Sequence, residues 1–168
     1  MNKRETWVAI LALPGMVTIV IPLLILALTN SLDFNEVFQN RDFLWLSLSF
    51  LLLIIGISLL VVTIKQFSKL GNGTLAPWDP PKTLIIEGLY SHVRNPMISG
   101  VIMIVLGEAL ILRSSGLWSY WLAVLILNLV YIPLVEEKRL EKKYGEAYIT
   151  YKNNVPRWIP RLTAWDGS

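Results

Sequence analysis

The sequence of 168 residues has no cysteine and a single histidine, His92. Disulfides, thiolate metal sites, cysteine nucleophiles and clustered-histidine metal sites are therefore excluded, and we predict no metal site. Charged residues are also scarce: they make up 16% of the chain, against about 25% in soluble domains. The net charge of +3 is small, so no nucleic-acid partner is needed to explain it.

Apolar residues take the place of the missing charges, at 54% of the chain, and the mean hydropathy is +0.55. Four apolar segments match the roughly 17–25 residues that cross a bilayer as a helix. They cover residues 7–28, 43–64, 96–112 and 117–135. Pro14 and Pro22 predict kinks in the first segment. We therefore predict one all-α domain over residues 1–168, a polytopic membrane protein with about four transmembrane helices.

Lysine and arginine are distributed unevenly between the predicted spans. With the N-terminus in the cytosol, all of the 15 Lys and Arg residues except Arg41 and Arg113 lie on the cytosolic side. Cytosolic loops of membrane proteins carry such an excess of positive charge. We therefore predict an integral membrane protein with both termini in the cytosol. The C-terminus carries no eukaryotic retention signal, so we expect a prokaryotic plasma membrane.

The loops between the spans differ in length. Only Arg113-Ser114-Ser115-Gly116 separates the last two spans, which predicts a tight antiparallel hairpin. The cytosolic loop 65–95 is long and rich in turn formers, as functional loops often are. After the fourth span the chain is polar, and we predict a cytosolic helix over 136–151 followed by a tail to residue 168. One apolar face of that helix recurs every four residues, at Leu140, Tyr144 and Tyr148.

The hairpin brings two polar stretches to one membrane depth. Arg94-Asn95-Pro96 begins the third span, and Glu136-Glu137 follows the fourth. Asparagine and proline favour the N-cap and first position of a helix, which explains Asn95 and Pro96 locally. The same helix N-terminus, with Arg94 beside it, is also a natural seat for a carboxylate. The paired glutamates repel each other, and a bound cation would relieve this repulsion. Alternatively, they are ordinary helix charges, with Glu136 facing Arg139 one turn on.

Three further residues of the third span invite interpretation. Glu108 is an ionisable residue inside a span and therefore a functional candidate. We favour a simpler explanation, in which Glu108 snorkels to the outer surface or pairs with Arg113. Gly100 and Gly107 predict close packing between helices.

The C-terminal half of the sequence resembles the superfamily of isoprenylcysteine carboxyl methyltransferases and phospholipid methyltransferases, which are integral membrane methyltransferases. Four stretches carry the resemblance: GNGTLAPWDPP at 71–81, GLYSHVRNPMISG at 88–100, LGEAL at 106–110, and EEKRLEKKYGEAYITYKNNVPRWIP at 136–160. The resemblance implies an S-adenosyl-L-methionine site at the cytosolic membrane face. The implied catalytic residues are Glu136, Glu137 and Arg94. The implied cofactor-binding residues are Gly71, Gly73, Gly88, Tyr90, Arg94, Asn95, Pro96, Glu136 and Glu137.

The sequence departs from that superfamily at two positions. Many members have histidine where this chain has Asn95, and tyrosine where it has Ile98. Asparagine forms hydrogen bonds but does not titrate near neutral pH, so we expect no general base at position 95. The identity of the methyl acceptor therefore stays open.

These observations predict S-adenosylmethionine-dependent methyl transfer to a lipophilic acceptor, either a prenyl-cysteine-like carboxylate or a lipid amine. Methyl transfer from a sulfonium needs alignment and exclusion of water, and neither a metal nor a thiol. The acceptor would enter from the bilayer, and membrane lipids are the expected partners. Two alternatives stay open: an NADPH-dependent sterol-type reductase, for which the chain leaves little room, and a non-catalytic transporter or scaffold that depends on Glu108.

Overall fold

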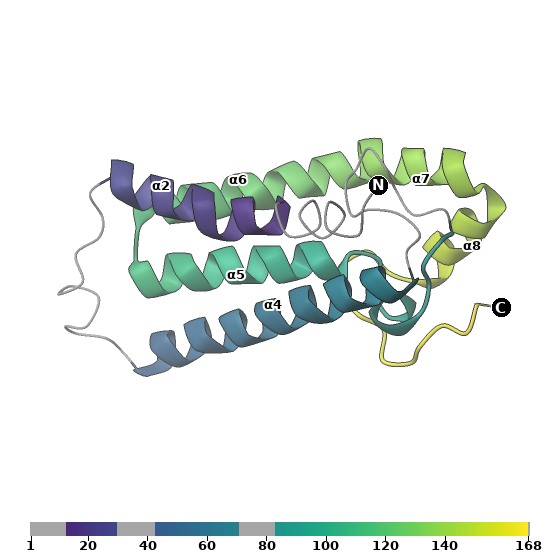
Figure 1. Ribbon diagram of the computed structural model, residues 1–168, viewed down its shortest axis with the longest axis horizontal. Coiled ribbons are helices and arrows are strands. Elements are labelled where there is room, and N and C mark those ends of the chain that lie inside the picture. The colour runs from purple at the N-terminus through teal and green to yellow at the C-terminus, as the bar shows by residue number, and fades with distance from the viewer. Residues whose placement is uncertain (1–12, 30–42, 71–82, 168) are drawn as a thin grey trace.

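The computed structural model describes residues 13–29, 43–70 and 83–167, and all regular secondary structure in these ranges is helical. The predicted all-α class is therefore confirmed. The helices are η1 (Met16–Val20), α2 (Ile21–Leu28), α4 (Phe43–Leu70), η2 (Gly88–Ser91), α5 (Pro96–Leu112), α6 (Ser115–Tyr131), η3 (Ile132–Glu136), α7 (Glu137–Tyr144) and α8 (Glu146–Asn154). The long helices lie side by side, and α7, α8 and the C-terminal tail gather at one end (Figure 1).

Two helical segments are long and apolar enough to cross a bilayer. They are Phe43–Gln66, with 24 residues, and the continuous helix Ser115–Tyr144, with 30 residues. Two shorter apolar helices, Leu13–Leu28 and Pro96–Leu112, lie beside them. A helix of that greater length measures about 45 Å, whereas the hydrocarbon core is about 30 Å thick. The last turns of the longer segment, including α7, therefore extend beyond the core.

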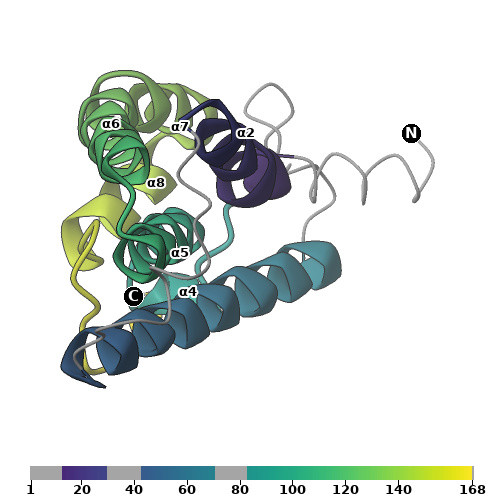
Figure 2. The same ribbon diagram turned by 90° about the vertical axis from the view of Figure 1, so that its left-hand side faces the viewer.

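The central helix α5 packs against α4 and α6, as the view along the bundle shows (Figure 2). Glycines allow the close approach of α4 and α5. A Cβ atom on Gly100 would lie 2.8 Å from the carbonyl oxygen of Gly56, and one on Gly107 would lie 2.9 Å from Cγ of Leu53. The two backbones therefore meet directly at Gly100, and the Leu53 side chain packs onto the bare backbone at Gly107. The predicted packing role of Gly100 and Gly107 is confirmed.

The hairpin between α5 and α6 turns within two residues, Arg113 and Ser114. Arg113 adopts a left-handed conformation with φ 48°, and the Ser114 hydroxyl accepts a hydrogen bond from the Leu117 N–H at 3.4 Å. The predicted tight hairpin is confirmed. It places the beginning of α5 and the end of α6 at the same end of the bundle (Figure 1).

Prolines coincide with two π-helical turns. The turn Met16–Val20 lies between Pro14 and Pro22, and the turn Ile132–Glu136 contains Pro133. Proline has no N–H for the regular helical hydrogen-bond ladder, and widened turns accommodate the interruption. The second turn ends at Glu136, so the irregular stretch lies directly before Glu137.

The prediction of a single cytosolic helix over 136–151 is wrong. The chain runs from α6 through η3 into α7 and then breaks at Gly145, before α8 begins. Gly145 has φ 57°, a conformation that glycine adopts without a Cβ clash, so the helix ends there. Residues of both helices nevertheless form the predicted apolar face. Buried Tyr148 packs with Tyr151 and Val155, and against them lie Leu140 and Tyr144.

The expected pairing of Glu108 with Arg113 is also wrong. Arg113 is exposed, and no ion pair joins it to Glu108 in the described part of the chain. The reason is the left-handed turn: Arg113 stands outside α5 and leaves the helical face on which Glu108 lies. Glu108 itself is half-buried, and its Oε2 atom is buried without a hydrogen-bond partner, so snorkelling to the outer surface stays a prediction.

Substitution of Gly100 tests the interlocked packing of α4 and α5. We expect Gly100→Ala to destabilise the fold by about 1–3 kcal/mol, because the new methyl group overpacks the interface. Thermal unfolding in detergent measures the effect. Gly15→Ala is the matched control, since a Cβ there meets nothing within 4 Å. Equal unfolding midpoints for the two variants would contradict the close contact.

Candidate functional site

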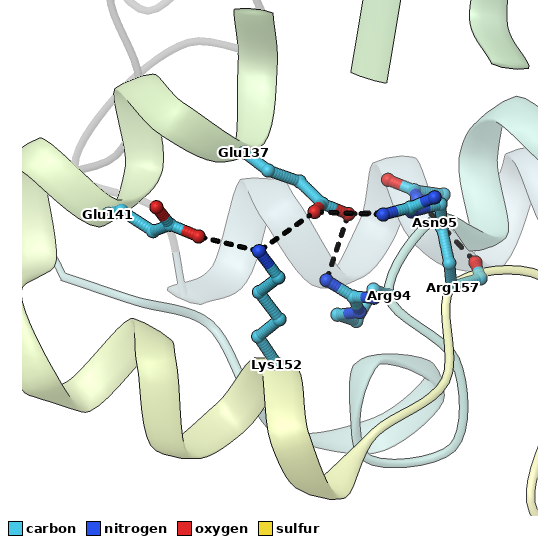
Figure 3. A network of polar contacts seen from close by, with 6 residues as sticks. All are labelled: Arg94, Asn95, Glu137, Glu141, Lys152 and Arg157. Atoms are coloured by element: carbon cyan, nitrogen blue, oxygen red, sulfur yellow. Dashed lines mark hydrogen bonds and ion pairs between the residues drawn. The ribbon is translucent and has the colours of Figure 1, made fainter. Parts of the chain in front are cut away.

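A buried carboxylate lies at the start of α7, where the side chain of Glu137 is only 3% exposed. Three cations surround it (Figure 3). Arg94 Nη1 donates to Oε1 at 2.9 Å, and Arg157 donates from Nε to Oε1 at 2.6 Å and from Nη2 to Oε2 at 2.9 Å. Lys152 Nζ lies 3.4 Å from Oε2. A buried charge is costly unless it is paired and hydrogen-bonded, and both conditions are met here.

These contacts keep Glu137 ionised. Burial alone would raise its pKa, but the hydrogen bond from Arg157 and the positive charges of Arg94, Arg157 and Lys152 outweigh burial and lower the pKa below its ordinary value. The same hydrogen bond raises the pKa of Arg157. Hydrogen bonding to Glu141, at 2.6 Å, is the main cause that raises the pKa of Lys152. The cluster is therefore fully charged around neutral pH.

The cluster joins segments that are far apart in the sequence. Arg94 belongs to the loop before α5, Lys152 to α8, and Arg157 to the C-terminal tail. Arg94 and Glu137 are both predicted site residues, and the structure brings them into direct contact. Lys152 and Arg157 were not predicted to take part. The sequence shows them only as two of many cytosolic cations, and nothing local distinguishes them from the exposed ones.

Arg94 has a buried donor without a partner. Its side chain is 9% exposed, and its Nε atom is buried without a hydrogen-bond partner. Tyr148 lies against the same group: burial and the charge of Glu137 raise its pKa to about 12, and Arg94 opposes this shift. A buried donor without an acceptor costs about 1–3 kcal/mol. A ligand atom that accepts from Nε would remove that cost.

Asn95 and Pro96 occupy the positions predicted for them, the N-cap and the first residue of α5. The Asn95 side chain, however, makes no capping hydrogen bond. Its Nδ2 atom instead lies 3.5 Å from the carbonyl oxygen of Arg157 and faces the tail. The local explanation of Asn95 is therefore incomplete, because the tail competes with the helix for its amide.

The tail runs along the loop that precedes α5. Three backbone hydrogen bonds join the tail to this loop. The N–H of Arg94 donates to the carbonyl oxygen of Pro156 at 2.9 Å, that of Arg161 to His92 at 3.0 Å, and that of Trp165 to Ser91 at 3.0 Å. His92 Nδ1 also lies 2.9 Å from the Arg161 carbonyl oxygen, so Nδ1 carries the proton and donates. The only histidine of the chain thus holds the tail in place.

Gly88 and Tyr90, two further predicted site residues, lie in the short helix η2. Gly88 has φ 58°, and a Cβ atom there would lie 2.8 Å from Nε2 of Gln66. Gln66 donates to the Glu87 carbonyl oxygen and accepts from the Leu89 N–H, so α4 anchors η2. Gln66 was not predicted to take part, although an amide side chain at the end of an apolar span is a signal for such a role.

The two adjacent glutamates have different surroundings. Glu137 is surrounded by cations, whereas half-buried Glu136 makes no hydrogen bond or ion pair with another described residue. Burial and the neighbouring charge of Glu137 raise the pKa of Glu136, and Arg139 opposes them. Burial also raises the pKa of the Tyr90 phenol, with smaller contributions from Tyr151 and Glu136. Glu136 is thus the carboxylate that is free to meet a ligand.

Two predicted cofactor residues, Gly71 and Gly73, lie outside the described residues, so their role stays a prediction. The cofactor and catalytic roles of the other predicted residues also stay predictions. Among them, Arg94 and Glu137 form an ion pair. The charge of Glu136 makes a small contribution to the raised pKa of Tyr90.

A protein-family model described as phospholipid methyltransferase matches residues 44–147. The match covers more than half of the chain and includes α5, α6 and both glutamates. The chain belongs to the phospholipid methyltransferase family. The predicted resemblance is thereby confirmed, and with its long apolar helices this family member is a membrane methyltransferase. No curated protein matches the chain. The family match ends before Lys152 and Arg157, so their contacts with Glu137 are known from the structure alone.

Removal of Arg94 tests the dependence of the fold on the buried cluster. We expect Arg94→Gln to destabilise the protein by on the order of 3 kcal/mol, because it takes a buried partner from a buried charge. Lys152→Gln removes a partner that is 35% exposed, and we expect it to cost less than about 1 kcal/mol. Thermal unfolding in detergent compares them. Equal losses would show that Glu137 is not shielded from water as described.

Acid sensitivity gives a second test of the cluster. The pKa of Glu137 is lowered in the folded protein, relative to about 4.3 in an unfolded chain. The carboxylate therefore stabilises the fold above pH of about 4.3, and this contribution is lost as the pH falls through the lower folded-state pKa. We expect unfolding midpoints of the wild type to fall in that acidic range more steeply than those of Glu137→Gln. Parallel pH profiles would contradict the lowered pKa.

Proposed function

We propose that the protein transfers the methyl group of S-adenosyl-L-methionine to a lipophilic acceptor at the cytosolic face of the membrane, with both termini in the cytosol. One observation carries the proposal. In a member of a phospholipid methyltransferase family, the buried Arg94 keeps an unpartnered Nε donor beside the N-terminus of α5. Family membership favours methyl transfer over the reductase and transporter alternatives.

Arg94 and the N-terminus of α5 fit the carboxylate of the methionine moiety. Arginine forms strong, directional hydrogen bonds with carboxylates, and a helix N-terminus offers free N–H groups to an anion. When bound, S-adenosyl-L-methionine supplies an electrophilic methyl group on a sulfonium. Both oxygens of Glu137 already accept from arginines. We therefore assign Glu137 a positioning role, in which it holds the guanidinium of Arg94.

An open apolar face on α6 and η3 supports the choice of a lipophilic acceptor. It consists of Ala123, Ile126, Leu127, Val130, Tyr131, Leu134 and Val135, most of which are exposed. The last of these residues directly precedes Glu136, so we expect a lipid chain against this face to have its headgroup at the level of that carboxylate. We propose that the acceptor is a phospholipid amine, in keeping with the family, and that a carboxylate acceptor is disfavoured beside Glu136. An amine must lose a proton when it is methylated, and Glu136 is placed to accept it.

Ligand binding tests the cofactor assignment. We expect S-adenosylhomocysteine to bind the purified protein in calorimetry. We expect Arg94→Lys to weaken binding by about tenfold or more, because an ammonium does not reproduce the planar fork of a guanidinium. Lys138→Gln, an exposed change on α7, should leave the affinity unchanged. No binding to wild-type protein that is shown to be folded would overturn the assignment.

Substitution of Glu136 tests the proton acceptor. We expect Glu136→Gln to lower kcat by roughly 10²–10⁴-fold, the usual contribution of general base catalysis. Binding of S-adenosylhomocysteine should be kept, since Arg94 and α5 hold the cofactor. Methylation assays on phospholipid amines, run beside calorimetry, separate the two effects. An unchanged kcat would show that another group or water takes the proton.

A further inference from the structure

The C-terminal tail, residues 155–167, exposes two large aliphatic side chains. Ile159 is 79% exposed and Leu162 is 99% exposed. Two other apolar residues of the tail turn inward, since Val155 is buried with Tyr151 and Trp165 packs against that cluster. The tail therefore has an inner face that joins the core and an outer point formed by Ile159 and Leu162.

Hydrogen bonds hold this outer point in place. The Arg94 N–H donates to the Pro156 carbonyl oxygen on one side of Ile159, and the Arg161 N–H donates to the His92 carbonyl oxygen on the other. The exposure of Ile159 and Leu162 is therefore a property of an ordered segment with fixed backbone contacts.

The cations of the same stretch turn the other way. Arg157 binds the buried Glu137, and Arg161 Nη1 donates to the Asn154 carbonyl oxygen at 3.0 Å. In a segment that faces water, the charged side chains would lie outside and the aliphatic ones inside. Here Arg157 turns inward to Glu137 while Ile159 and Leu162 turn outward, so their apolar surface is left to whatever surrounds the protein at this point.

The position of the tail identifies that surrounding. It is hydrogen-bonded to residues 91–94, which lead directly into the apolar helix α5. Figure 2, which looks along the bundle, shows the tail at the outer edge of the molecule, and Figure 1 shows it at the end where α4 finishes. The tail thus lies at the outer edge of the bundle, at the end where the apolar helix α4 finishes and α5 begins.

We infer that the C-terminal tail is an interfacial membrane anchor, in which Ile159 and Leu162 insert into the bilayer at the boundary between headgroups and acyl chains. Short segments with an apolar face and flanking arginines bind at this depth. Insertion would also affect the ion pairs of Glu137, because Arg157, which binds Glu137, belongs to the same tail as the outer point. Insertion would hold Arg157 against the carboxylate. The inference does not depend on the proposed methyl transfer.

The absence of cysteine makes a direct test possible. Ile159→Cys and Leu162→Cys are each labelled with a nitroxide, and the full-length protein is placed in nanodiscs of phosphatidylcholine and phosphatidylglycerol. Electron paramagnetic resonance then compares collisions with oxygen, which concentrates in lipid, and with a water-soluble nickel chelate. Lys142→Cys is the matched control, since Lys142 is an exposed residue of α7.

We expect the ratio of oxygen to nickel accessibility to be several-fold higher at positions 159 and 162 than at position 142. The same ratio at all three positions would place the tail in water and overturn the inference. Low accessibility to both reagents at 159 and 162 would also overturn it, because protein would then cover the tail. Equal unfolding midpoints of wild type and labelled variants verify that each variant is folded.

Discussion

A carboxylate in a buried position is stable only when cations and hydrogen bonds compensate it, and Glu137 has three cations within reach. Each of these cations comes from a different segment. Three segments therefore meet at the start of α7: the loop that precedes α5, the helix α8 and the C-terminal tail. Without this charge, helix packing would still align α4 and α5 through their glycines, and backbone hydrogen bonds would still hold the tail along residues 91–94, but Arg157 would lose the partner that turns its side chain toward the start of α7.

The adjacent glutamates show how one interaction shapes the rest of the site. Because Glu137 is occupied by arginines, it fixes the position of Arg94 and is not itself open to a ligand. Glu136, one residue earlier, is only half-buried and has no cationic partner within hydrogen-bond distance among the described residues. The π-helical turn around Pro133 ends at Glu136 and lies directly before Glu137. A ligand would thus meet one fixed guanidinium and one carboxylate that has kept its capacity to bind or to accept a proton.

Much of this arrangement follows from local sequence signals. Apolar runs predicted the helices, the turn at Arg113 predicted the hairpin, and Gly100 and Gly107 predicted close packing. The break at Gly145 was missed because the regular spacing of Leu140, Tyr144 and Tyr148 continues across it. Apolar periodicity reports which residues are buried and says little about where a glycine takes a positive φ.

Other parts of the site could not be predicted, because they depend on contacts across the chain. Arg157 and Lys152 look like any other cytosolic cation until the fold places them beside Glu137. Gln66 likewise acquires its role only when α4 and η2 come together. The pairing of Glu108 with Arg113 was one of two explanations offered for an ionisable residue in a span, and it failed because Arg113 adopts the left-handed turn that ends α5.

Transfer of a labelled methyl group tests the central claim most directly. The purified protein, in bilayers that contain phosphatidylethanolamine, is incubated with S-adenosylmethionine carrying an isotope in its methyl group, and the lipids are extracted and analysed by mass spectrometry. The account predicts that the label appears on the lipid amine, and that Glu136→Gln strongly slows its appearance. Label that stays entirely in the aqueous phase, with folded wild-type protein and every acceptor lipid offered, would contradict it.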